Sequence, residues 1–156
     1  MNSAALAPLL PAIAAVCEAC YPAEACGLLL EGANGAAEFV AIPNIAGQAA
    51  ARETSSRSSR DGYVMDPARV LAALEAAEAA GAQLAGIVHS HPDAEACFSA
   101  EDRMMALGGA DAPLWPGVDY LVISCRNGSA VAARIFRWDA ACADFYEEEL
   151  PWCRTS

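Results

Sequence analysis

The chain has 156 residues, a length that fits one domain with a single core. Of these residues 56% are hydrophobic and 19% are charged, a composition typical of a globular protein. Its formal net charge of −11 argues against binding to nucleic acid and against attachment to an anionic membrane, because both need clustered Lys and Arg. The acidity serves either solubility or attraction to a partner with a basic face. We expect residues 1–156 to form a single domain.

Residues 5–20 carry apolar side chains at helical spacing and are predicted to form a helix. This N-terminal segment lacks a positively charged start and is interrupted by two prolines, so we interpret it as part of the fold and not as a targeting segment. We find no apolar run that approaches the roughly 20 residues needed to span a bilayer. The seven cysteines are odd in number and irregularly spaced, which indicates reduced thiols and a cytoplasmic protein.

The next segments predict a hairpin followed by an irregular region. Residues 26–31 form a continuous apolar run typical of a buried strand, and residues 37–43 are its expected hairpin partner. Residues 47–60 are polar, rich in Ser and Arg, and without an apolar period. We expect a mobile loop there, which is either a plain surface loop or a flap over a substrate. Residues 63–66 are predicted to form a short strand.

The second half of the chain alternates between helices and strands. Asp66 suits the N-cap and Pro67 the first position of a helix that runs to about Ala80, where Gly81 ends it. The apolar run at residues 84–88 predicts a central strand that is buried on both faces.

Residues 90–98 are expected to form a loop, and residues 99–107 a helix. A hairpin of residues 118–125 and 130–136 is predicted around an Asn-Gly turn, and residues 140–149 are predicted to form a last helix. This alternation predicts an α/β fold in which helices cover a mixed sheet.

His89 and His91 follow the predicted central strand and are the two histidines of the chain. Side chains two residues apart on a strand point to the same side, so both imidazoles can reach one metal ion. Asp102 follows after a loop long enough to fold back, and would add a carboxylate from the first turn of the next helix. Two His and one Asp are typical of a catalytic zinc site, where water takes the fourth position and its pKa falls to about 7.

Ser99 stands three residues before Asp102, the spacing of a helix N-cap with an acidic residue at N3. The Ser99 oxygen could cap the helix while its O–H donates to a substrate oxyanion. For Asp102 the two roles compete, because a carboxylate bound to zinc has less capacity to cap. Hydrolysis also needs a general base, and no H-E-x-x-H motif is present. The candidates for the base are glutamates from the N-terminal part: Glu18, Glu24, Glu31 and Glu38.

The combination of Glu24, His89-x-His91, Ser99 and Asp102 resembles the motif of the JAMM (MPN+) zinc metalloproteases, particularly the small stand-alone bacterial type. The flanking segments PAEACGLLLEG, DPARV and GIVHSHPD also match the family pattern, and the resemblance covers nearly the whole chain. It implies a single-domain mixed, curved β-sheet flanked by helices, the MPN/JAB1 fold, which is cytidine-deaminase-like.

The resemblance also implies one catalytic Zn²⁺ held by His89, His91 and Asp102, with Glu24 as general base and Ser99 stabilising the oxyanion. Implied substrates are adducts or conjugates joined through the C-terminal Gly-Gly of a ubiquitin-like or sulfur-carrier protein. An E1-like activating enzyme is an expected partner in the same pathway, and a homodimer is compatible with the family.

The alternative is a non-catalytic, zinc-containing MPN interaction module, because inactive relatives exist in this fold. Cys97 lies in the loop between the ligands. It is either a bystander thiol or a regulatory fourth ligand.

Overall fold

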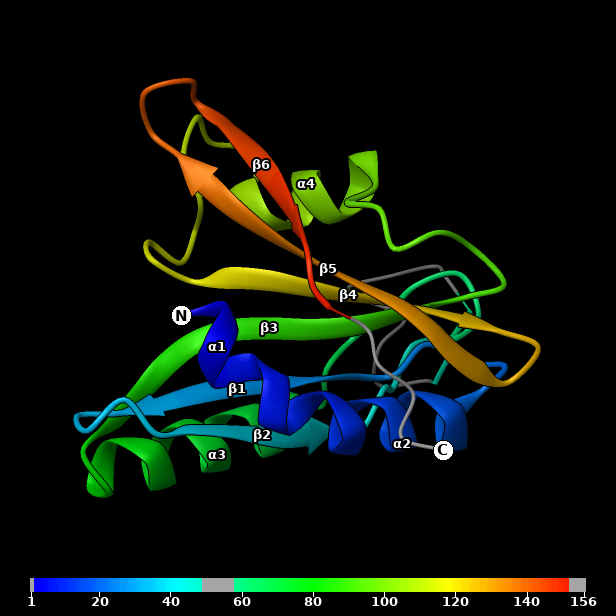
Figure 1. The fold of residues 1–156 in the computed structure, drawn as a ribbon, viewed down its shortest axis with the longest axis horizontal. Helices are drawn as coiled ribbons and strands as arrows, with labels where there is room; N and C mark the ends of the chain where they lie inside the picture. The colour runs from blue at the N-terminus through cyan, green and yellow to red at the C-terminus, as the bar shows by residue number, and fades with distance from the viewer. Residues whose placement is uncertain (1, 49–57, 152–156) are drawn as a thin grey trace.

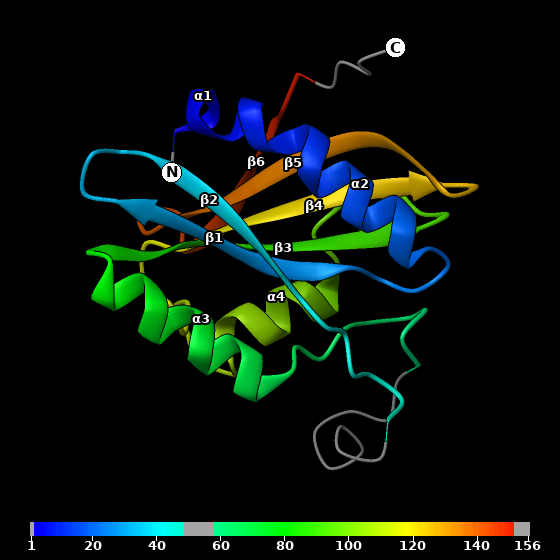
Figure 2. The same ribbon diagram turned by 90° about the horizontal axis from the view of Figure 1, so that it is seen from below.

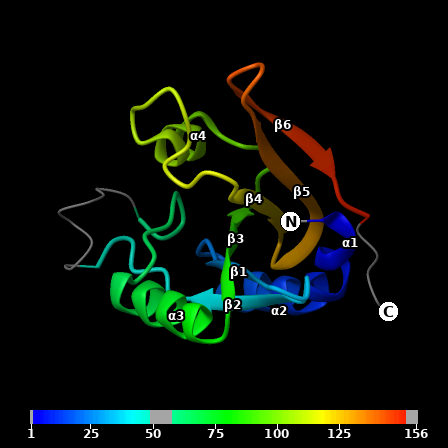
Figure 3. The same cartoon turned by 90° about the vertical axis from the view of Figure 1, so that its left-hand side faces the viewer.

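The structure is a computed structural model that describes residues 2–48 and 58–151 (Figure 1). In these residues six strands form one sheet in the order β2-β1-β3-β4-β5-β6. The pair β3–β4 is parallel and the other pairs are antiparallel. Helix α2 lies on one face of the sheet, and α3 and α4 lie on the other (Figure 2). Figure 3 shows how the sheet curves from β2 to β6. The predicted mixed, curved sheet flanked by helices is confirmed.

The predicted first helix is built from three consecutive helical pieces, α1 (Ser3–Leu6), the 3₁₀ turn η1 (Ala7–Leu9) and α2 (Leu10–Cys20). Pro8 and Pro11 are the second residues of η1 and α2, within the first turn, where the missing N–H of proline costs no hydrogen bond inside that element. The prolines therefore divide the helix without ending it.

The stretch Ser3–Cys20 is 18 residues long and has a mean hydropathy of 1.7, so by length and composition alone it could cross a membrane. We expected no apolar run to approach the roughly 20 residues of a membrane span, and this stretch corrects that expectation. Core helices and signal sequences pass the same test. In this fold the stretch contributes four side chains to the core cluster on its face of the sheet: Leu6, Leu10, Ile13 and Cys17.

Strands β1 (Cys26–Gly32) and β2 (Ala37–Ile42) form the predicted hairpin. Alternate β1 side chains enter different cores, since Leu29 packs with the cluster under α2 whereas Leu28 packs with the cluster under α3. The strand is therefore buried on both faces, which explains its continuous apolar run.

Helix α3 (Pro67–Ala79) begins and ends where predicted. The Asp66 side chain accepts hydrogen bonds from the N–H groups of Ala68 and Arg69, which caps the helix. Gly81 follows the last turn with a φ of 70°, a conformation that favours glycine.

Strand β3 (Ala82–Pro92) is longer than predicted, because pairing with β4 (Asp119–Arg126) continues as far as Pro92. The residues expected at the start of a loop therefore lie in the sheet. Strand β5 (Ser129–Asp139) follows β4 through the predicted Asn-Gly turn, in which both residues have positive φ.

The predicted last helix is wrong. Residues Asp144–Glu149 form β6, an edge strand that pairs antiparallel with β5. The Ala and Glu residues of the segment 140–149 favour a helix locally, but pairing with β5 and burial of Phe145 beside Tyr120 decide the structure of residues 144–149. The acidic side chains on this exposed edge also discourage pairing with another chain.

The predicted strand at residues 63–66 is reduced to an isolated bridge between Asn44 and Met65. The segment is too short to extend the sheet. Residues 58–66 run beside the sheet, and we call them the strap. The predicted mobile loop at residues 47–60 lies for the most part outside the described residues, which exclude 49–57.

Candidate metal centre

His89 and His91 come from the carboxyl-terminal end of β3 and lie on the face of the sheet covered by α3 and α4. Val88, the residue before His89 on the strand, packs on the opposite face under α2. Both imidazoles are buried, with His89 fully so and His91 9% exposed. Their Nε2 atoms are 3.1 Å apart, so the predicted same-side arrangement on the strand is present.

Asp102 brings its carboxylate to these rings from the first turn of α4 (Ala100–Leu107). Its Oδ1 lies 3.2 Å from His89 Nε2, and its Oδ2 lies 3.5 Å from His91 Nε2. Four ligands held tetrahedrally at about 2.0–2.1 Å from zinc are about 3.3 Å apart. The spacing and chemistry of the three donors therefore fit a single metal ion of this size.

The outer ring atoms of the two histidines have different surroundings. His91 Nδ1 lies 2.9 Å from the backbone oxygen of Glu95. In the tautomer whose Nδ1–H donates to that carbonyl, the lone pair of Nε2 is directed at the site. His89 Nδ1 is buried without a hydrogen-bond partner among the described residues. The His89 ring instead stacks on Tyr63, with centroids 4.9 Å apart and ring planes 28° apart.

Burial and hydrogen bonding set the charges in this cluster. Burial lowers the pKa of His89 and outweighs the nearby carboxylate. Burial also opposes charge on His91, but its hydrogen bonds to Asp102 and the Glu95 carbonyl raise its pKa above the usual value. Burial opposes charge on Asp102 as well, yet hydrogen bonds to both histidines and to Ser99 hold its pKa well below the usual range. The carboxylate is thus ionised, as a metal ligand must be.

Ser99 and Asp102 form a capping box at the start of α4. Asp102 N–H donates to Ser99 Oγ over 3.1 Å, while Asp102 Oδ2 accepts from the Ser99 N–H at 2.8 Å and lies 2.6 Å from Ser99 Oγ. Oδ2 caps the helix and also lies 3.5 Å from His91 Nε2, whereas Oδ1 is directed at His89. The expected competition between capping and metal binding therefore concerns Oδ2 and stays a prediction.

We expect Ser99→Ala to lower the free energy of unfolding by about 1 kcal/mol, because α4 loses its side-chain cap. For a chain of this size that corresponds to a fall in Tm of about 2–4 °C. Calorimetry of the metal-free protein measures it. Ser99→Thr is the matched control, since it keeps the hydroxyl and should keep most of the stability. Equal Tm values for Ser99→Ala and wild type would contradict the cap.

Glu24 is the candidate base that lies at the ligand end of the sheet. Cys26 pairs with His89, and the N–H of Ser90 donates to the Ala25 carbonyl over 3.0 Å, so Glu24 continues β1 opposite His91. Glu24 is buried, with 8% exposed, and its charge contributes to the raised pKa of His91.

The other three candidate glutamates lie elsewhere. Glu31 and Glu38 are at the far end of the β1–β2 hairpin. Glu18 is on α2, across the sheet, where its Oε1 accepts from the Ala130 N–H.

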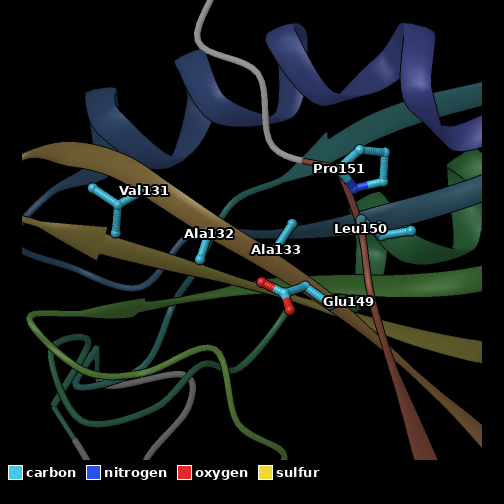
Figure 4. A pocket seen from close by; sticks show the side chains of 6 residues that line it. All are labelled: Val131, Ala132, Ala133, Glu149, Leu150 and Pro151. Atoms are coloured by element: carbon cyan, nitrogen blue, oxygen red, sulfur yellow. The ribbon is translucent and has the colours of Figure 1, made fainter.

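Cys97 is exposed, and among the described residues it does not belong to the metal-binding group. A separate shallow cavity lies between β5 and the chain that follows β6 (Figure 4). It contains none of the candidate site residues, and its lining is Val131, Ala132, Ala133, Glu149, Leu150 and Pro151.

Tyr63 and the Glu95 carbonyl were missed by the sequence reasoning. Any residue type can supply a backbone carbonyl, so the sequence cannot indicate which carbonyl binds His91. Tyr63 was interpreted only as a residue of a short strand. A tyrosine beside the polar segment 47–60 is the one signal that could have indicated a site-facing ring.

Comparisons with known proteins agree with this geometry. The family model described as prokaryotic homologs of the JAB domain matches residues 6–139. A desampylase from Haloferax volcanii is 36% identical over 105 residues, 66% of this chain and 63% of that protein, so the chain spans less than two thirds of that relative. A solved structure from Desulfitobacterium hafniense is similar with a TM-score of 0.65 and 26% identity, covering 92% of this chain and 87% of that one. Another from Salinibacter ruber has a TM-score of 0.59 and 28% identity, covering 96% and 90%.

Proposed function

The chain belongs to the family of prokaryotic homologues of the JAB domain, and on that basis we propose that it is a zinc-dependent peptidase or isopeptidase. The observation that carries the proposal is the convergence of two imidazoles, one ionised carboxylate and a buried glutamate at one end of β3. Three protein ligands leave one coordination position open, which is the pattern of catalytic and not of structural zinc sites.

Zinc bound by His89, His91 and Asp102 would supply a Lewis acid that polarises a carbonyl and lowers the pKa of water. Glu24 takes the proton from the attacking water and returns it to the leaving amine. Its buried position opposite His91, at the ligand end of the sheet, suits this role.

Ser99 is the proposed donor to the oxygen that becomes negatively charged. Its hydroxyl has one proton and lies 2.6 Å from Asp102 Oδ2 in this structure. Donation to a substrate therefore requires the hydroxyl to rotate toward the substrate oxygen, while Ser99 Oγ continues to accept from the Asp102 N–H.

We propose that the substrate bond follows the C-terminal Gly-Gly of a ubiquitin-like or sulfur-carrier protein. The similarity to a protein named desampylase supports a ubiquitin-like substrate. An E1-like activating enzyme acting on the same carrier and a cytoplasmic location belong to this proposal. The free state of the cysteines in the described residues is compatible with a reducing compartment.

We expect the zinc-loaded protein to cleave a carrier protein fused through Gly-Gly to a reporter peptide or to the amine of a lysine. Removing zinc with 1,10-phenanthroline should abolish cleavage, and adding back one equivalent of zinc should restore it. Product mass and metal content measure the two parts. One bound zinc without cleavage of any Gly-Gly-linked substrate would favour the non-catalytic interaction module. Cleavage that persists in the metal-free protein would contradict the zinc mechanism.

A further inference from the structure

One half-buried amide side chain, that of Asn44, makes four hydrogen bonds to the backbone. Its Nδ2 donates to the carbonyl of Glu24 over 2.9 Å and to the carbonyl of Gly62 over 3.2 Å. Its Oδ1 accepts from the N–H of Ala46 over 2.9 Å and from the N–H of Val64 over 3.1 Å. Asn has two N–H donors and two acceptor lone pairs, so its whole hydrogen-bonding capacity is used.

These bonds join three segments that are distant in sequence. Asn44 follows β2, Glu24 precedes β1, and Gly62 and Val64 belong to the strap at residues 58–66. The strap is also fastened by the N–H of Ile45, which donates to the Val64 carbonyl over 2.8 Å. The N–H of Glu24 donates to a strap carbonyl as well, that of Ser59, over 2.7 Å. The backbone of Glu24 is therefore held on its N–H side by the strap and on its carbonyl side by Asn44.

Tyr63 lies between the two strap residues that Asn44 binds. Its ring stacks on the imidazole of His89, whose Nδ1 has no hydrogen-bond partner among the described residues. The strap therefore supplies the ring that packs against the face of that imidazole, while its Nε2 contacts His91 and Asp102. The same amide that anchors the strap also anchors the backbone of Glu24.

We infer that Asn44 is a positioning residue, which sets the location of the Glu24 carboxylate and of the Tyr63 ring relative to the metal ligands. A general base must lie within about 2.6–3.2 Å of the oxygen whose proton it takes. A displacement of about 1 Å can cost about 100-fold in rate. This inference rests on the proposed function of Glu24, but the hydrogen-bond network itself does not.

The sharpest test is Asn44→Asp. Asp keeps the shape and both acceptor bonds, but it cannot donate to the carbonyls of Glu24 and Gly62 and places a second oxygen against them. We expect kcat to fall by about 10–100-fold, KM to stay within about twofold, and one zinc per chain to be retained. Asn44→Ala removes all four bonds and should lower kcat at least as far.

Asn34→Asp is the matched control, because the Asn34 side chain also accepts a backbone N–H, that of Ala36, but in the β1–β2 turn at the end of the hairpin remote from the ligands. It makes the same change of side chain and should leave kcat unchanged. Unchanged kcat in zinc-loaded Asn44→Asp, or an equal fall in Asn34→Asp at matched folded fraction, would overturn the inference.

Hydrogen exchange gives a readout that does not need activity. Asn44→Asp should accelerate exchange of the Glu24 amide, which donates to the strap, whereas Asn34→Asp should not. If the wild-type protein cleaves no Gly-Gly-linked substrate, the proposed function fails, and this comparison still decides whether Asn44 holds Glu24. An unchanged Glu24 exchange rate in Asn44→Asp would contradict the inference in that case.

Discussion

Replacing Glu24 with Gln is expected to lower kcat by about 10²–10⁴-fold, the usual contribution of a general acid–base group. Gln has nearly the same shape, and the backbone bonds of residue 24 to Ser59 and Asn44 do not involve the carboxylate. The fold, the metal ligands and one bound zinc should therefore be retained. The loss should appear in kcat and in kcat/KM alike, because proton transfer is needed in the transition state and not for binding.

Glu31→Gln is the matched control for this prediction, because Glu31 lies on the same hairpin but at the end remote from the ligands. It removes the same charge from the chain and should leave kcat unchanged. Full turnover by Glu24→Gln with zinc bound would exclude Glu24 as the base. The mechanism would then have to find its proton acceptor among the other groups near the site.

Elements with local signals at both ends could be predicted from the sequence. Helix α3 has a capping Asp66, a proline at its first position and a glycine past its end, and it forms as expected. The β4–β5 hairpin has its Asn-Gly turn. In these cases local preference and tertiary packing favour the same structure.

Strand β6 could not be predicted in the same way, because its structure depends on a distant partner. Residues 140–149 contain helix-favouring Ala and Glu, but pairing with the edge of β5 and the aromatic cluster around Phe145 make residues 144–149 a strand. The extension of β3 through His91 likewise depends on pairing with β4.

In the site, too, some features follow from local sequence and others depend on contacts between distant segments. The spacing of His89 and His91 on a strand predicts their convergence from local geometry alone. Choosing Glu24 among four glutamates requires the register between β1 and β3, which no local pattern contains. The roles of Tyr63 and Asn44 depend on contacts between the strap and distant parts of the chain, and no local sequence pattern contains those contacts.

Replacing Asp102 with Asn is expected to abolish zinc-dependent activity and to weaken zinc binding by more than about 100-fold, beyond the effect usual for a residue outside the ligand set. Asn can still accept the N–H of Ser99 through its oxygen, so the cap of α4 should be largely kept. The expected defect is therefore in metal affinity and not in folding. This defect distinguishes the role of Asp102 from that of Ser99. Replacing Ser99 with Ala should reduce helix stability while leaving all three ligands in place.

The measurement is the rise in Tm on adding zinc. A protein that binds zinc only when folded gains about 2.7 kcal/mol at a zinc concentration 100 times its Kd, and Asp102→Asn should lose this gain. Asp93→Asn is the matched control, because Asp93 lies in the loop after the histidines and accepts from Tyr21 and Asn127 instead of facing the ligands. It should keep the zinc-dependent rise. An equal rise in Asp102→Asn and wild type would show that the carboxylate does not bind the metal, and the site would reduce to two imidazoles.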